Sequence, residues 1–287
     1  MQIQFGCFKC MFNMICDMAQ KAFDDDARRR ELLGELTQAA MANAGKCTPP
    51  EMASLLYGIY GRVTGVSDPF AEEKHHSTLL ARELYPMLEV LVANADDPFV
   101  MAVKVAVGGN VIDFGATPFF KLESARDAIF ATVSSPVDSA ALAELKKRAV
   151  TAENIFYILD NCGEAVIDRL LIEQLGTEKI TLGVRGKAIF NDITRSELAE
   201  SGLGDLPVID TGDNAPGVSL VNSSAEFLEK LRTADLVIAK GQGNFESLCD
   251  APENGNIFFL FRVKCPVVEE LTAAPAGSLQ IRCGAPR

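Results

Sequence analysis

Hydrophobic residues recur at intervals of three and four along the first 95 residues, which is the spacing of an amphipathic helix. The pattern is clearest in residues 27–36 and 79–91, and no strand is expected in this part of the chain. Thr48 precedes two prolines, so we expect it to cap a helix that the prolines begin. Residues 1–95 are therefore predicted to form a helical lobe.

Residues 96–150 continue the helical pattern but contain several turn-forming residues. A turn is expected at two adjacent glycines, 108 and 109, and an alanine-rich helix is expected over residues 139–149, beyond Pro118 and Pro136. We interpret this segment as a helical bridge that packs on the rest of the protein.

The pattern changes at residue 151, where short runs of β-branched and aromatic residues begin to alternate with helix-period segments. The expected strands cover residues 155–159, 179–184, 206–209, 235–239 and 257–263. Such alternation indicates the α/β class, with a mainly parallel sheet covered by helices. Residues 151–287 are therefore predicted to form an α/β domain whose loops gather at one edge of the sheet.

Composition narrows the classes of partner. The chain has 287 residues, of which 48% are hydrophobic, enough for one large core or two smaller ones. Its net charge of -12 argues against a nucleic acid partner, because binding to phosphate backbones requires clustered Lys and Arg. Apolar runs such as residues 257–261 are much shorter than the roughly 20 residues that span a bilayer. We expect no membrane insertion and, without a signal-like N-terminus, a cytoplasmic location.

Eight cysteines are too few for a disulfide scaffold in a chain of this length. Cys7 and Cys10 form a Cys-x-x-Cys pair, which is half of a zinc or iron-sulfur site and needs further ligands. The alternative is that both thiols pack between helices.

Hard oxygen ligands follow the strand expected at residues 155–159. Asp160 and Asn161 lie between this strand and a helix expected over residues 164–175, at the sheet edge where α/β proteins usually place their chemistry. Their carboxylate and amide oxygens suit an octahedral divalent cation. The alternative is that both residues cap the helix, since Asp and Asn are preferred N-caps.

Asp192 follows the apolar run 188–190, at what we expect to be a second junction of strand and helix. Neighbouring parallel strands would bring Asp160 and Asp192 together at the carboxyl edge of the sheet. With the Asn161 amide they supply three hard ligands and leave positions for water and substrate oxygens, as in magnesium and manganese sites. Asp192 can equally be a helix cap. The only two histidines are adjacent in a polar helical segment, so a histidine-based zinc site is not expected.

Lys240 ends another expected strand and is followed by Gly241 and Asn244. A lysine beside glycines and a helix N-terminus suits an anion, because the backbone amides and the ammonium group face negative charge. The spacing is not that of a P-loop. A glycine-rich turn with a solvated lysine is the alternative.

Asn110 and Asp113 lie among glycines in an otherwise apolar stretch, where polar side chains need a buried partner or a ligand. They are expected either to reach a metal or substrate across a cleft or to form a helix-breaking turn.

Several motifs together resemble the damage-control phosphatases, and the resemblance covers nearly the whole chain. The motifs are Gly109-Asn-Val-Ile-Asp-Phe-Gly115, Asp160-Asn-Cys-Gly-Glu164, Asn191-Asp192 and Lys240-Gly-Gln-Gly-Asn244. The branch found in archaea and bacteria is suggested by Cys7-x-x-Cys10, Pro49-Pro50 and Asp68-Pro69-Phe70 followed by Lys74.

This resemblance implies a Rossmann-like three-layer α/β/α sandwich with an N-terminal helical lobe, and metal-dependent hydrolysis of small phosphorylated metabolites such as sugar phosphates. The expected cofactor is a divalent cation: magnesium, manganese, cobalt or nickel. The resemblance implies that the cation is bound by Asp160, Asn161 and Asp192, and that phosphate or substrate is bound by Asn110, Asp113, Lys240, Gly241 and Asn244.

For the reaction we hypothesise direct attack of water on phosphorus, with Asp160 orienting the water. Glu164, one helical turn on, is either a general base or a supporting partner of the ligands, or else a solvated first-turn residue that interacts with the helix dipole. A covalent route through Asp160 lacks the Asp-x-Asp spacing of phosphatases with an aspartate nucleophile.

Two other functions remain open from the sequence. One is an S-adenosylmethionine-dependent methyltransferase, although residues 160–163 contain one glycine rather than a glycine-rich turn. The other is a non-catalytic protein that binds a metal or a metabolite.

Overall fold

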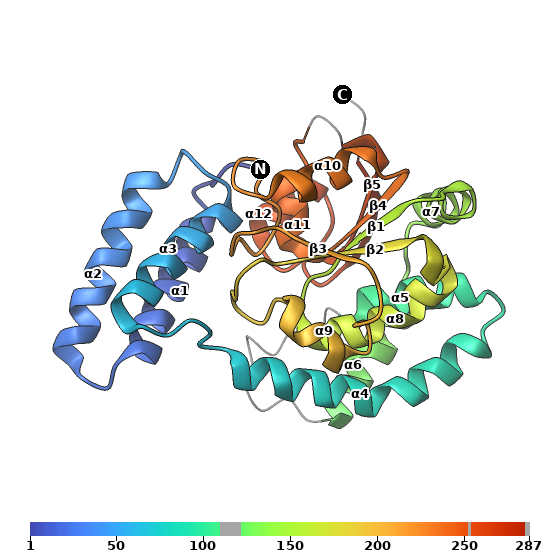
Figure 1. Cartoon of the computed structure of the whole chain (residues 1–287), viewed down its shortest axis with the longest axis horizontal. Coiled ribbons are helices and arrows are strands. Elements are labelled where there is room, and N and C mark those ends of the chain that lie inside the picture. Colours follow the sequence, from blue (N-terminus) through green and yellow to red (C-terminus); the bar gives the residue numbers. More distant parts are fainter. Residues whose placement is uncertain (110–121, 252–253, 285–287) are drawn as a thin grey trace.

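The structure is a computed structural model that describes residues 1–109, 122–251 and 254–284. It consists of a sheet covered by helices on both faces and a smaller unit of three helices beside it (Figure 1). No helix in these ranges is both long and apolar enough to cross a membrane.

The three-helix unit contains α1 (Cys7–Ala22), α2 (Asp26–Asn43) and α3 (Pro49–Thr64), which pack around a hydrophobic cluster of their own. Thr48 caps α3 as expected: its side chain accepts a hydrogen bond from the Glu51 amide, and Glu51 accepts one from the Thr48 amide. The helical pattern of the first part of the chain is thus confirmed.

The sheet has six strands in the order β3-β2-β1-β4-β5-β6. Their bounds are β1 Ile155–Ile158, β2 Ile180–Val184, β3 Val208–Asp210, β4 Leu236–Lys240, β5 Ile257–Arg262 and β6 Leu279–Cys283. The first five are parallel and begin and end within two residues of the expected strands. The sixth pairs antiparallel with β5 and was not predicted.

Successive side chains of β1 point to opposite layers, which is why the whole strand is buried. Ile155 and Tyr157 join one hydrophobic core, and Phe156 and Ile158 join the other. The first layer contains α4 (Ala71–Ala93), α5 (Pro98–Gly109), α6 (Leu122–Val133), α7 (Ser139–Thr151), α8 (Cys162–Leu175) and the short α9 (Leu198–Ser201). The second contains α10 (Ala225–Thr233), α11 (Gly241–Leu248) and α12 (Pro266–Thr272). The expected α/β/α sandwich is confirmed.

Helix α4 lies against α8, although the sequence grouped α4 with the N-terminal lobe (Figure 1). A β-carbon on Gly163 would lie 2.9 Å from the Ser77 carbonyl oxygen, so the two helices pack closely at this point. The division of the chain into a lobe, a bridge and a domain at residues 95 and 150 stays a prediction.

The strand order reverses direction between β1 and β4, because the chain passes from β1 to β2 and β3 on one side and to β4 and β5 on the other. In open α/β sheets ligands bind beyond the carboxyl ends of the strands at such a switch point. Asp160 follows β1 and Lys240 ends β4, so the fold places both beside the switch point.

Candidate active site

Asp192 lies beside Asp160, but by a different route from the one expected. Residues 188–190 form no strand; they belong to the loop that follows β2. This loop folds back on the end of β1, where the Ile193 amide donates to the Asp160 carbonyl at 2.9 Å and the Cys162 amide donates to the Asn191 carbonyl at 3.0 Å. The expected strand is wrong, yet the two carboxylates reach the same sheet edge.

The apolar run failed as a strand because its side chains are buried elsewhere. Ile189 is fully buried in the cluster of the three-helix unit. Phe190 has a φ of 42°, a left-handed conformation that is unfavourable for a bulky residue, and its ring packs edge-on against Tyr57 with centroids 4.8 Å apart. These contacts hold the turn that brings the chain back toward β1.

Arg185 connects the candidate residues and was missed by the sequence analysis. It directly follows β2 and is fully buried. Its Nε donates to Asp192 at 2.7 Å, Nη1 donates to Asn244 at 3.1 Å, and Nη2 lies 3.5 Å from Asp160 Oδ1. An arginine directly after an expected strand carried the same positional signal that singled out Asp160.

Asn161 does not cap α8, because its side chain makes no capping hydrogen bond. Its amide nitrogen donates instead to Asp160 Oδ2 at 3.1 Å and to Glu164 Oε2 at 3.2 Å. With the nitrogen engaged by two carboxylates, the amide oxygen is the atom of Asn161 available as a ligand.

Lys240 is fully buried, so the alternative of a solvated lysine is wrong. Its ammonium donates to the Ala106 carbonyl at 3.0 Å, to Asp168 Oδ1 at 2.6 Å and to Glu164 Oε1. Three acceptors match the three protons of the ammonium group. The expected contact with phosphate stays a prediction.

Gly241 begins α11 with a φ of 80°, and its backbone lies against Asp160. A β-carbon at this position would be 1.9 Å from Asp160 Oδ2, so only glycine fits. Asn244, on the next turn, is buried; its amide nitrogen donates to the Lys240 carbonyl at 2.6 Å while its oxygen accepts from Arg185. The glycine-rich segment thus joins β4 to the carboxylates.

Burial raises the pKa of Asp160 well above its usual value, and the nearby Asp192 and Glu164 carboxylates raise it further. Arg185 opposes this rise. The ionised form of Asp160 is therefore disfavoured without a counter-charge, and a divalent cation at the end of β1 would supply one.

The donor set fits such a cation, with two carboxylates and one amide oxygen as hard ligands. In the part of the chain that the structure describes, no three His, Cys, Asp or Glu side chains converge as a metal-binding group. A cation held by these three groups would keep coordination positions for oxygen atoms of water or substrate, as is usual for magnesium.

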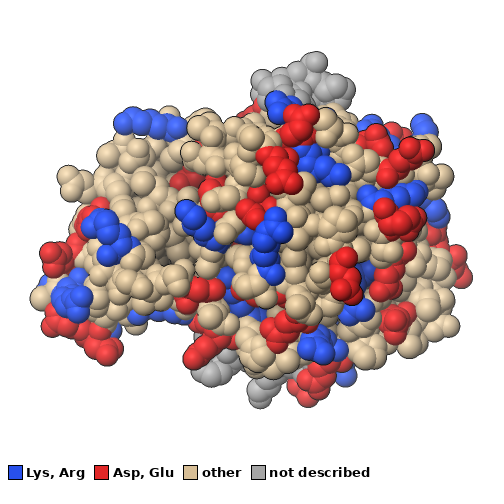
Figure 2. Space-filling view, viewed as in Figure 1, with Lys and Arg blue, Asp and Glu red and all other residues tan. Residues whose placement is uncertain are grey.

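A cavity of about 480 Å³ lies between α3 and the loop after β2. Its wall includes Gly186 and Thr194, close in sequence to Arg185 and Asp192. Other lining residues are mostly polar or aromatic: Tyr57, Tyr60, Arg62, Ser67, Asp68, Lys187, Ser196, Glu197 and Asn214. Figure 2 shows a hollow between the three-helix unit and the rest of the molecule, with Lys and Arg side chains at its border.

Two walls of this cavity are joined by Lys74, a buried residue of α4. Its ammonium lies 2.9 Å from Asp68 and 3.8 Å from Glu197. The motif that resembled the archaeal and bacterial branch thus has a structural role next to the site.

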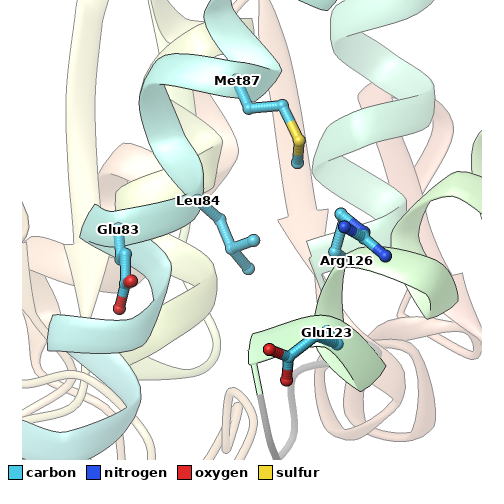
Figure 3. Close-up of a pocket in the computed structure, with 5 residues that line it drawn as sticks. All are labelled: Glu83, Leu84, Met87, Glu123 and Arg126. Atoms are coloured by element: carbon cyan, nitrogen blue, oxygen red, sulfur yellow. The ribbon is translucent and has the colours of Figure 1, made fainter.

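A second cavity, of about 240 Å³, lies between α4 and α6 (Figure 3). Its lining residues are Glu83, Leu84, Met87, Glu123 and Arg126. None of the candidate residues borders it, so we do not assign the site there.

The remaining expectations concern two segments. Asn110 and Asp113 lie outside the described residues, and the last described residue before them, Gly109, packs near the Glu164 side chain. Cys7 and Cys10 lie on α1, and burial raises the pKa of the Cys7 thiol, which disfavours the thiolate form that binds metals.

Comparison with known proteins identifies the family of the chain. Residues 3–279 match the family model described as the damage-control phosphatase ARMT1-like domain. The damage-control phosphatase PH1575 of Pyrococcus horikoshii is 35% identical over 287 residues, which cover 97% of this chain and 97% of that protein. A damage-control phosphatase of Archaeoglobus fulgidus is 29% identical over 280 residues, 94% of this chain and 96% of that protein. The crystal structure of PH1575, a DUF89 family protein, has a TM-score of 0.89 at 32% identity and covers 99% of this chain and 100% of its own.

Proposed function

The chain belongs to the ARMT1-like damage-control phosphatases, and from this membership we propose that it hydrolyses phosphomonoesters of small metabolites with a divalent cation as cofactor. The observation that carries the proposal is the convergence of Asp160, Asn161 and Asp192 beside the switch point of the sheet. The family match sets aside the methyltransferase alternative.

The cation would be held by the Asp160 and Asp192 carboxylates and by the Asn161 amide oxygen. When bound, it neutralises phosphate oxygens and lowers the pKa of a bound water. Arg185 spaces the two carboxylates by pairing with both, and Gly241 leaves the room that Asp160 needs.

Positive charge for the substrate phosphate comes from the chain itself. Lys240 and the backbone amides at the start of α11 lie beside the carboxylates and suit an anion. A phosphate contact by Lys240 requires its ammonium to exchange one of its protein acceptors for a phosphate oxygen, since all three protons are engaged.

We propose that water attacks phosphorus directly, with Asp160 orienting it. The Asp-x-Asp spacing of phosphatases with an aspartate nucleophile is absent, which disfavours a covalent intermediate on Asp160. Glu164 is buried and accepts hydrogen bonds from Asn161 and Lys240, so it positions these two side chains. We also assign it the role of the general base that accepts the proton of the attacking water.

The organic part of the substrate would occupy the cavity beside α3. Hydroxyl, amide and charged side chains line it, which suits a molecule rich in hydroxyl groups such as a sugar phosphate. A volume of about 480 Å³ is within the range of small-molecule sites.

The proposal is tested by hydrolysis of p-nitrophenyl phosphate and a panel of sugar phosphates. Protein stripped with a chelator is assayed after addition of magnesium, manganese, cobalt or nickel. We expect turnover that depends on the cation and disappears in Asp160→Ala, while Asp17→Ala, an exposed position on α1, keeps it. Tight cation binding without turnover of any substrate would overturn the proposal and favour a non-catalytic binding protein.

A further inference from the structure

Asp168 is a fully buried carboxyl group behind the site, and none of the roles above uses it. It lies one turn after Glu164 on α8, so both side chains are on the same face of the helix. Its Oδ1 accepts a hydrogen bond from the Lys240 ammonium at 2.6 Å. Lys240 is thus held between two carboxylates of one helix.

Tyr157 faces Asp168 from the adjacent strand β1. Its ring is fully buried in the core that α8 covers. Within the described residues, the Tyr157 hydroxyl and Asp168 Oδ2 are both buried and neither makes a hydrogen bond, although the two groups interact electrostatically. The oxygen of Asp168 that does not bind Lys240 therefore faces the Tyr157 hydroxyl.

A continuous series of contacts leads from Asp168 to a candidate ligand. Asp168 binds Lys240, Lys240 binds Glu164 Oε1, and Glu164 Oε2 accepts the Asn161 amide at 3.2 Å. Removing the charge at position 168 would leave Glu164 as the charged partner of the ammonium, beside the neutral Ala106 carbonyl. A stronger attraction between Lys240 and Glu164 competes with the hydrogen bond from Asn161 to Glu164.

We propose that Asp168 is a positioning residue: it holds the Lys240 ammonium at the end of β4 and, through Lys240, fixes Glu164 against the Asn161 amide. This inference rests on the phosphatase function proposed above. A buried ion pair is not needed for stability alone, because apolar replacements of such pairs are often neutral or stabilising. The cluster contains one ammonium and two carboxylates, which favours a role in the site over one in the core.

The first test is a double-mutant cycle of Asp168→Asn and Lys240→Gln, with kcat and KM measured in the presence of the best cation. Asp168→Asn is nearly isosteric, and we expect it to fold and to lose about tenfold in kcat/KM, against about 100-fold for Lys240→Gln. If Asp168 acts through Lys240, the double variant matches Lys240→Gln within about threefold.

A product of the two separate losses, about 1000-fold, would overturn the positioning role, because independent effects multiply. The matched control is Asp235→Asn, at the opposite end of β4, where the carboxylate accepts the Glu153 and Asn154 amides. We expect it to lower stability without changing kcat/KM.

The second test needs only nearly isosteric variants and remains informative if Lys240→Gln does not fold. The titratable groups that face Asp168 are Lys240 of β4, Tyr157 of β1 and Glu164 of α8, and α5 adds the Ala106 carbonyl to the same ammonium. The Tyr157 hydroxyl lowers the pKa of Asp168, so Tyr157→Phe raises it. We expect the acid limb of the kcat profile to move to higher pH in Tyr157→Phe and to vanish in Asp168→Asn.

An acid limb that is the same in the wild type and both variants would overturn the proposal. Failure of the underlying function looks different: the wild type itself would then show no cation-dependent turnover. Normal wild-type turnover with an additive cycle would reject the role of Asp168 alone.

Discussion

Gly241 lies so close to Asp160 that a β-carbon at position 241 would be 1.9 Å from a carboxylate oxygen. The two residues follow adjacent strands, β4 and β1, at the point where the strand order reverses. This contact fixes the carboxylate against the backbone of α11 and makes the glycine as important to the site as the charged residues.

Gly241→Ala is expected to displace the Asp160 carboxylate and to lower kcat/KM by roughly 100-fold, the effect of a shift of about 1 Å at a reacting group. The matched control is Gly65→Ala, because Gly65 also has a positive φ, 73°, but no atom within 4 Å of the added methyl group. Both variants should lose about 1–2 kcal/mol of stability from backbone strain. Equal activity in the two variants would contradict the role assigned to the contact.

Arg185→Lys tests whether the guanidinium organises the carboxylates. Lysine keeps the charge but cannot bind Asp192, Asp160 and Asn244 together, so we expect kcat/KM to fall by roughly 100-fold. Arg195→Lys, in an exposed pair with Asp210, is the control and should remain active. A fully active Arg185→Lys enzyme would show that charge alone suffices.

The stability of the cation-free protein should depend on Asp168 in a defined pH range. Burial raises the pKa of Asp168 to about 7, although Lys240 opposes the rise, whereas an unfolded Asp titrates near 4. Between these two pKa values the folded protein binds a proton that the unfolded chain releases. The protonated Asp168 therefore stabilises the folded state at pH 4, and this stabilisation is lost as the pH rises through 7.

Urea denaturation of wild type and Asp168→Asn at pH 5 and pH 8 measures this contribution. Between pH 5 and pH 8, we expect the wild type to lose about 2–3 kcal/mol of its free energy of unfolding relative to Asp168→Asn. A difference that is constant with pH would mean that Asp168 is ionised throughout this range.

Tyr57→Phe tests the cavity beside α3. The hydroxyl of Tyr57 is buried and the residue lines the cavity. We expect the KM for sugar phosphates to rise by about five- to tenfold, because one hydrogen bond to the substrate is lost. The KM for p-nitrophenyl phosphate should stay unchanged, because its organic part has no hydroxyl groups. A parallel rise for both substrates would place the organic part of the substrate elsewhere.

The five parallel strands could be predicted from the sequence, because each is a run of β-branched and aromatic residues bounded by turn formers. The antiparallel β6 was missed since its run, Leu279–Cys283, contains Gln and Arg and follows no helical segment of the expected length. The run 188–190 was misread because apolar side chains buried in another helical unit look like those buried in a sheet.

Part of the candidate site was also open to sequence reasoning. Asp160 and Lys240 follow buried strands, and position alone pointed to them. Arg185 was missed although it also directly follows a buried strand. Asp168 lies within a helix, where a charged residue is normally solvated, and only tertiary packing shows that it is buried. The pairing of Lys240 with carboxylates of α8 depends on contacts between residues more than 70 positions apart.

The central pairing of β1 with β4 also bears on how the protein folds. Such a pairing of distant segments is slow to form, because the entropy of a long stretch of chain is lost before the stabilising contacts between the strands are made. Until β4 docks, Lys240 is absent from α8 and the carboxylates of that helix have no counter-ion from the sheet. Catalytic competence should therefore appear only after β4 has paired with β1, and the recovery of activity would report this pairing.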